Sequence, residues 1–140
     1  MKVLYACKPY SLGSWIIRFF TFSKFSHTAI KVSEDLIIDS TLPTGVRSIT
    51  ANEFAKHYPN YLELDIAVPN EDAARDFLLY QVGKPYDWTA LLGMVLQRKW
   101  EEEDSWFCSE LLEAAAKAGG RSRFRDDVYR ITPQQSWAVL

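Results

Sequence analysis

The sequence predicts an α+β fold in which an antiparallel sheet packs against helices. Most of the first half of the chain consists of short stretches in which polar and apolar residues alternate, as they do in half-buried strands. The second half contains stretches with helical spacing that are preceded by capping residues and followed by glycine. The strand-like stretches 27–32 and 36–40 are separated by only three polar residues, which favours an antiparallel hairpin.

The composition fits one soluble globular domain spanning residues 1–140, because 140 residues is a usual size for a single domain. Hydrophobic residues make up 48% of the chain and charged residues 24%, which excludes disorder over most of its length. The net charge of −2 argues against a nucleic-acid binder that works through bulk charge. The composition does not specify the oligomeric state.

The chain has no apolar stretch that approaches the length of a membrane-spanning helix, about 18 residues. Its first residues also lack the apolar length of a signal peptide. We therefore expect a cytoplasmic protein without a transmembrane segment. A phage-encoded protein, or one exported by another route, would have the same sequence features.

The two cysteines, Cys7 and Cys108, are too few for a disulfide framework. The two histidines and two cysteines lie far apart along the chain and show no zinc-like spacing. We therefore expect no metal and no other cofactor. Cys7 lies at the end of a strand-like stretch, and we interpret it as a core residue.

Alternation and turn residues place the expected strands. They are residues 2–7, 27–32, 36–40, 46–49, 62–68 and 128–131. The link between the second and third is Ser33-Glu34-Asp35, and Pro43-Thr44-Gly45 is a turn signal before the fourth. Residues 62–68 alternate most regularly, which predicts a half-buried strand.

Helices are expected at 15–22, 88–96 and 106–118, and from Glu71 to the stop at Gly83. Asn70 is the expected cap of the helix at Glu71, and Asp104 or Ser105 of the helix at 106–118. The aromatic stretch 15–22 either faces the core or forms an aromatic surface for lipid or substrate. The acidic residues 101–104 are interpreted as a solvated loop or helix end.

Cys108 is the candidate nucleophile, because it lies in the first turn of the last long helix. The free backbone N–H groups and the positive end of the helix dipole stabilise a thiolate there. A nucleophilic cysteine also needs a base. His57 lies in a polar, surface-like stretch, whereas His27 opens a strand beside small and β-branched residues. A histidine held on a strand suits a base that must keep one geometry, so His27 is the candidate base.

Asp39 is the candidate residue that orients His27. If residues 33–35 form a three-residue loop, Asp39 lies opposite Ala29 and diagonal to His27. Diagonal positions on one face of a hairpin are about 7–8 Å apart, which allows a carboxylate to contact an imidazole. A two-residue loop would place the two side chains on opposite faces. A mid-strand carboxylate that follows two isoleucines also requires a partner.

Several segments resemble one family of enzymes. Gly83-Lys84-Pro85-Tyr86-Asp87-Trp88 and Trp106-Phe107-Cys108-Ser109-Glu110-Leu111-Leu112 resemble the tyrosine and cysteine-helix segments of NlpC-type cell-wall peptidases. Phe25-Ser26-His27-Thr28-Ala29-Ile30 resembles the histidine strand of the circularly permuted branch. That branch includes the YiiX-like hydrolases and, more distantly, the lecithin retinol acyltransferase family. Ile37-Ile38-Asp39-Ser40 and Gly45-Val46 resemble the third-residue strand and the turn that follows it.

The resemblance implies a permuted papain-like fold, in which the antiparallel sheet packs against a helix that carries the cysteine at its N-terminus. It implies Cys108 as nucleophile, His27 as base and Asp39 as the orienting residue. The family's third position is often Glu, His, Asn or Gln, so Asp39 departs from the usual choice. Tyr86 matches a tyrosine near the nucleophile; it lines the substrate site, or helps polarise the substrate carbonyl, or serves only in packing.

The implied function is that of a cysteine peptidase or amidase, which cleaves an amide or peptide bond through an acyl-enzyme. A murein peptide is one possible substrate. Two other functions remain open at this point. One is a lipid acyl-hydrolase or acyltransferase of the same fold, which the aromatic stretch 15–22 would favour. The other is a structural or binding module, such as a phage component, that has lost activity.

Overall fold

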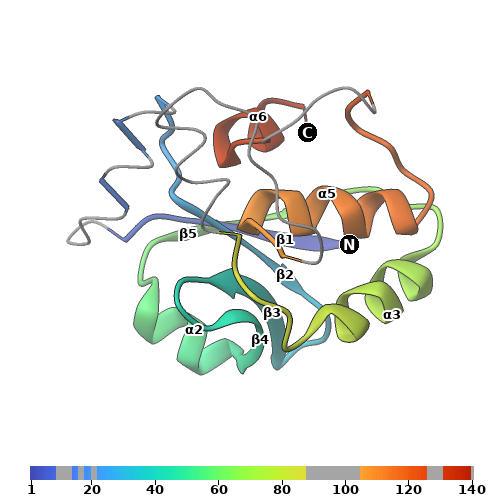
Figure 1. The fold of residues 1–140 in the computed structure, drawn as a ribbon, viewed down its shortest axis with the longest axis horizontal. Helices are drawn as coiled ribbons and strands as arrows, with labels where there is room; N and C mark the ends of the chain where they lie inside the picture. Colours follow the sequence, from blue (N-terminus) through green and yellow to red (C-terminus); the bar gives the residue numbers. More distant parts are fainter. Residues whose placement is uncertain (9–13, 16–17, 20–21, 88–104, 126–130, 140) are drawn as a thin grey trace.

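A computed structural model of the chain describes residues 1–8, 14–15, 18–19, 22–87, 105–125 and 131–139 (Figure 1). These residues form the predicted α+β fold. Its sheet has five strands in the order β4-β3-β2-β1-β5, and all neighbours are antiparallel. The strands are β1 (Lys2–Ala6), β2 (His27–Lys31), β3 (Leu36–Thr41), β4 (Gly45–Thr50) and β5 (Tyr61–Asp65). The described helices are α2 (Ala51–His57), α3 (Glu71–Gln81), α5 (Cys108–Ala118) and α6 (Pro133–Ala138).

The hairpin of β2 and β3 has the predicted register. Ala29 pairs with Asp39 and Lys31 pairs with Ile37, so the loop is formed by residues 33–35. The prediction of a three-residue loop is therefore confirmed. Side chains alternate along each strand, which places His27 and Asp39 on the same face of the sheet.

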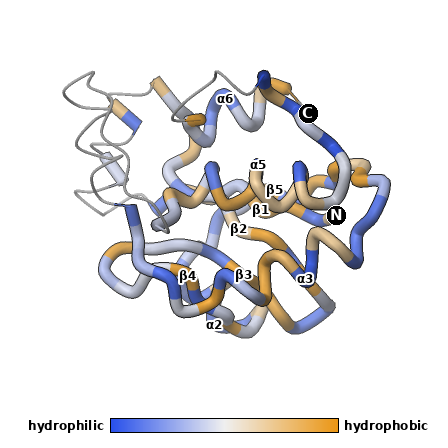
Figure 2. Tube along the Cα trace, turned by 45° about the vertical axis from the view of Figure 1, so that its right-hand side comes forward, coloured by the Kyte–Doolittle hydropathy of each residue, from blue (hydrophilic) through white to orange (hydrophobic). Residues whose placement is uncertain are grey.

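Helices cover both faces of the sheet. Val3 and Tyr5 of β1 belong to the cluster that contains Leu111 and Leu112 of α5, whereas Leu4 and Ala6 cluster with Phe54 of α2. Figure 1 shows α5 crossing one face with α3 and α6 nearby, and α2 beside β4. In Figure 2 the hydrophobic stretches of β2 and α5 lie side by side. Because successive side chains of β1 point to opposite faces of the sheet, this strand contributes to two hydrophobic cores, one on each face.

The strand β5 differs from its prediction. Alternation predicted a half-buried strand over 62–68, but β5 ends at Asp65, and Leu62 is 40% exposed. Ile66 and Val68 are buried beyond the end of the strand. The physical reason is that β5 is an edge strand, paired only with β1 among the described strands, so the helices cover little of it.

The helix α3 confirms its prediction, because the side chain of Asn70 accepts a hydrogen bond from the Ala73 N–H at 3.0 Å. The start of α5 corrects a prediction: Phe107 holds the cap position, not Asp104 or Ser105. Residues 105–107 are instead extended. The Trp106 N–H bonds to the Pro85 carbonyl at 3.1 Å, and this pairing delays the helix until Cys108.

Other predictions fall wholly or partly outside the described residues. The expected helix at 88–96 and the acidic stretch 101–104 lie outside them, as do residues 128–130 of the expected last strand. Ile131, the end of that strand, is described and is not in a strand. Within 15–22, residues 15 and 18–19 are helical. The short helix α6 was not predicted. None of the helices that the structure describes is long and apolar enough to span a bilayer.

Candidate active site

Three elements bring the predicted catalytic residues together. His27 is the first residue of β2, Asp39 lies in the middle of β3, and Cys108 is the first residue of α5. All three are buried, with exposed fractions of 5%, 0% and 2% in that order. The helix α5 packs against both β2 and β3. The chain therefore places a thiol, an imidazole and a carboxylate at the junction of the sheet and one helix N-terminus.

The imidazole of His27 connects the other two groups. Its Nε2 lies 2.8 Å from Oδ2 of Asp39 in a buried hydrogen bond. The side chain of Cys108 lies close enough to interact with the ring of His27 and to raise its pKa. Because Nε2 is occupied by the carboxylate, the ring nitrogen left to face the thiol is Nδ1. The imidazole thus has the carboxylate as its hydrogen-bond partner and the thiol as a neighbour.

The surroundings of His27 favour the protonated ring. Burial alone would lower the pKa of His27, but the interactions with Asp39 and Cys108 outweigh it and raise the pKa to about 9. The imidazolium is therefore the main form at neutral pH. An imidazolium beside a sulfur, at a helix N-terminus, is the environment in which proteins stabilise a thiolate.

Arg47 is a site residue that the sequence reasoning missed. Its Nε donates to Oδ1 of Asp39 at 2.8 Å, and its Nη2 donates to Oδ2 at 3.2 Å. Burial would raise the pKa of Asp39, but the bonds to His27 and Arg47 hold it below its usual range. A signal was present in the sequence: Arg47 follows the turn at 43–45 and pairs directly with Asp39 across β3 and β4.

Aromatic rings cover His27 and were also missed. The ring of Tyr58 stacks on the imidazole with centroids 4.8 Å apart and an angle of 11°, and Phe54 packs behind it at 6.4 Å. Phe54 lies in α2, and Tyr58 is the residue that follows this helix. Stacking removes rotational freedom from the imidazole. His57 is exposed, as predicted, and does not contribute to this cluster.

Ser40 connects the sheet to the start of α5. Its hydroxyl donates to the carbonyl of Trp106 at 2.6 Å, and Trp106 precedes Cys108 by two residues. Ser40 itself follows Asp39 in β3. This hydrogen bond therefore fixes the strand that carries Asp39 relative to the helix start that carries Cys108. Ser40 belongs to the segment 37–40 that carries the resemblance, but the sequence indicated no role for its side chain.

The structure places Tyr86 beside the cysteine segment. Tyr86 is 8% exposed, forms a parallel bridge with Trp106, and has its ring 5.9 Å from that of Phe107. Burial and the nearby charge of Cys108 both raise the pKa of Tyr86. The ring is therefore close to Cys108, as the resemblance implied. Its two roles, contact with a substrate and packing, both fit this position.

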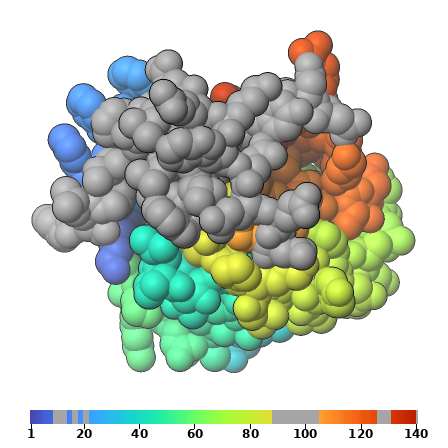
Figure 3. All heavy atoms as spheres, in the orientation of Figure 1, coloured from blue at the N-terminus to red at the C-terminus, as the bar shows by residue number. Residues whose placement is uncertain are grey.

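The backbone before Tyr86 is hydrogen-bonded to β4. The Val46 N–H donates to the Lys84 carbonyl and the Gly83 N–H donates to the Val46 carbonyl, both at 2.8 Å. In Figure 3 residues 83–87 lie against the atoms of β4 on the same face. This pairing brings the segment that carries Tyr86 to the edge of the sheet next to Arg47.

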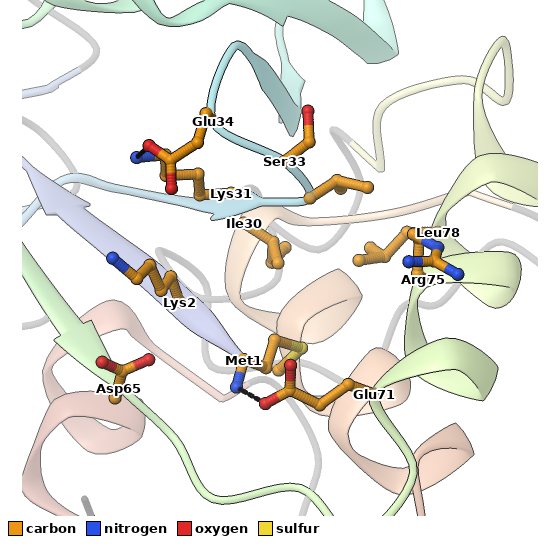
Figure 4. A pocket seen from close by; sticks show the side chains of 11 residues that line it. Met1, Lys2, Ile30, Lys31, Ser33, Glu34, Asp65, Glu71, Arg75 and Leu78 are labelled. Carbon is orange, nitrogen blue, oxygen red and sulfur yellow. Dashed lines mark hydrogen bonds and ion pairs between the residues drawn. The ribbon is translucent and has the colours of Figure 1, made fainter.

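The remaining candidate groups lie apart from this cluster. Cys7 is a free thiol and is half-buried, so it is not the core residue that was expected. Within the ranges that the structure describes, no three His, Cys, Asp or Glu side chains are grouped as metal ligands. A cavity of about 230 Å³ lies at the opposite end of β2, near the loop 33–35 (Figure 4). Several of its charged groups are ion-paired, such as Lys31 with Glu34.

Arg47 yields a prediction about the proton on His27. In Arg47→Met the NMR titration midpoint of the His27 ring is expected to rise above 9, because the imidazolium loses a neighbouring cation and Asp39 interacts with His27 alone. Arg75→Met is the matched control, since Arg75 pairs with Asp72 on α3. An unchanged or lower midpoint in Arg47→Met would contradict the assigned role.

No protein-family pattern matches the chain, and no curated protein is similar to it. The assignment of a function therefore depends on the geometry of the site.

Proposed function

We propose that the protein is a cysteine hydrolase of permuted papain-like architecture that cleaves an amide or peptide bond. One observation carries the proposal: the buried ring of His27 is hydrogen-bonded to the Asp39 carboxylate and lies beside the Cys108 thiol, close enough for the two to interact. Cysteine nucleophiles are recognised by such a chain of nucleophile, base and orienting group.

In the proposed reaction the proton of the Cys108 sulfur resides on His27. The thiolate attacks the carbonyl carbon of the substrate, and a C–S bond forms. Backbone N–H groups in the first turn of α5 have no partner within the helix and would meet the developing oxyanion. His27 then gives its proton to the leaving amine, and the C–N bond breaks.

Deacylation returns the site to its starting state. Water attacks the thioester carbonyl while His27 accepts its proton. The C–S bond then breaks, the acid leaves, and the proton returns to the pair formed by His27 and Cys108. Throughout the cycle Asp39 remains ionised, because Arg47 and His27 both stabilise its charge. Its role is to hold the ring and to balance the imidazolium.

Peptides, including murein peptides, are the first choice of substrate. A second candidate is acyl transfer or hydrolysis on a lipid ester, which one observation favours: Trp15 and Phe19 are 58% and 59% exposed and stack on each other. Hydrolysis of fluorogenic peptide amides, compared with that of acyl esters, separates the two substrate classes.

The reactivity of the thiol tests the proposed function directly. At pH 7, iodoacetamide is expected to alkylate Cys108 at least about tenfold faster than Cys7, because only Cys108 has an imidazolium partner. Peptide mass spectrometry measures both rates in one sample, so Cys7 is the internal control.

His27→Ala is expected to reduce the rate at Cys108 to that of Cys7 and to leave the rate at Cys7 unchanged. Equal rates in the parent protein, together with no effect of His27→Ala, would exclude the hydrolase.

A further inference from the structure

An aromatic patch lies outside the proposed active site. We define it as Trp15, Phe19 and Phe22, which are 58%, 59% and 92% exposed. Trp15 and Phe19 are four residues apart, and their rings stack at 5.3 Å with an angle of 14°, so they present one joint surface. Large aromatic side chains contribute most to stability when buried, so three exposed ones within eight residues require a reason.

Phe22 has an unusual backbone as well as an exposed ring. Its φ is +49°, the only positive φ at a non-glycine residue in the part of the chain that the structure describes. A bulky residue in this region is strained. Glycine or asparagine would relieve the strain, yet the position holds a phenylalanine whose ring has little contact with the rest of the protein. The strain and the exposure both point to a ring that contacts something outside the chain.

The charges around the patch have one sign along the sequence. Residues 8–24, which contain the patch, include Lys8, Arg18 and Lys24 and no aspartate or glutamate. Lys8 and Lys24 are exposed, and Arg18, which lies between the two stacked rings in sequence, is half-buried. The partner that fits exposed aromatic rings among cations is an apolar layer with an anionic surface, which is the interface of an anionic bilayer.

The patch is attached to the start of β2. The Ser14 hydroxyl donates to the Ser26 hydroxyl at 2.6 Å, and the Ser26 N–H donates to the Ala6 carbonyl at 3.0 Å. Phe25 packs on Tyr5 and Trp137, which fixes the chain between the patch and the sheet. The described residues of 14–24 lie at one end of the molecule (Figure 1). A surface that contacts the patch therefore meets the end of the protein at which β2 begins.

We propose that this end of the protein binds anionic membranes, with the rings of Trp15, Phe19 and Phe22 in the interface and Lys8 and Lys24 against lipid headgroups. The proposal goes beyond the hydrolase and does not depend on it. A second copy of the chain and an acidic protein are the other occupants that such a surface could accept.

Vesicle sedimentation tests the proposal with the full chain. Binding is expected to vesicles of phosphatidylcholine with about 30% phosphatidylglycerol and to be much weaker with phosphatidylcholine alone. The variant Trp15→Ser/Phe22→Ser is expected to lose at least about tenfold in partition coefficient. Lys8→Gln/Lys24→Gln is expected to bind anionic vesicles as weakly as the parent binds neutral ones.

The control variants carry the same changes elsewhere. Tyr80 on α3 is 78% exposed, and Lys56 on α2 is exposed, so Tyr80→Ser and Lys56→Gln are expected to bind as the parent does. Circular dichroism confirms that each variant is folded.

Two results would overturn the proposal. One is that the parent protein binds anionic vesicles no better than neutral ones. This result counts against the proposal whether or not light scattering detects a dimer that Trp15→Ser/Phe22→Ser removes. The other is unchanged binding by both double variants. Alkylation of Cys108 is measured on the same samples, so a failure of membrane binding is distinguished from a failure of the hydrolase.

Discussion

Asp39→Asn is expected to abolish hydrolysis and to destabilise the fold by about 3 kcal/mol in urea unfolding at pH 7. Asp39 is fully buried and accepts hydrogen bonds from His27 and Arg47, so the amide leaves two buried or half-buried donors competing for one oxygen. The NMR midpoint of His27 is expected to fall well below 9, because burial is then opposed by Cys108 alone.

The pH dependence of stability gives a second measurement on the same variant. The pKa of His27 is raised from 6.5 to about 9 on folding, so the stabilisation is fully present below pH 6.5 and is lost as the pH rises through 9. The parent should therefore lose stability over this window, and Asp39→Asn should lose much less. Asp35→Asn in the exposed hairpin loop is the control. Equal pH profiles for Asp39→Asn and the parent would contradict the assignment.

Gly45→Ala is expected to cost about 2–5 kcal/mol of unfolding free energy. Gly45 has φ +81°, where an L side chain is strained, and a Cβ there would overlap the Lys84 carbonyl and approach Pro85 Cα at 3.0 Å. These contacts are with backbone, which cannot move without displacing the pairing between β4 and residues 83–84.

Gly83→Ala is a matched control for the overlap. Gly83 has φ +92° and nothing within 4 Å of an added Cβ, so only the backbone strain remains, about 1 kcal/mol. The difference between the two variants in urea unfolding measures the contact between β4 and residues 84–85. Equal losses would mean that this contact contributes nothing to stability.

The part of the site that the sequence predicted depends on short-range rules. Three polar residues between two strand-like stretches define the register of β2 and β3, and this register places Asp39 beside His27. Asn70 and the acidic residues after it define the start of α3 in the same local way. Such features need no knowledge of the rest of the chain.

The features that the sequence did not predict depend on contacts between residues far apart in the chain, or on strand pairings that the sequence does not specify. Phe107 replaces the predicted cap because Trp106 pairs with Pro85, some twenty residues earlier. Tyr58 reaches His27 only because α2 folds over that face of the sheet. Polar and apolar residues do alternate over 62–68, but β5 lies at the edge of the sheet. Leu62 is therefore exposed, and the strand ends at Asp65. Arg47 lies two residues after the turn signal at 43–45, but only the register of β4 against β3 identifies it as the partner of Asp39.

The order of the site along the polypeptide has a consequence for biosynthesis. The ribosome releases the histidine, the aspartate and the arginine first, and Cys108 follows Asp39 by 69 residues, 108 minus 39. At about 5–20 residues per second, Cys108 leaves the ribosome several seconds after His27, Asp39 and Arg47. The proposed site is therefore incomplete in the nascent chain until α5 packs against the sheet.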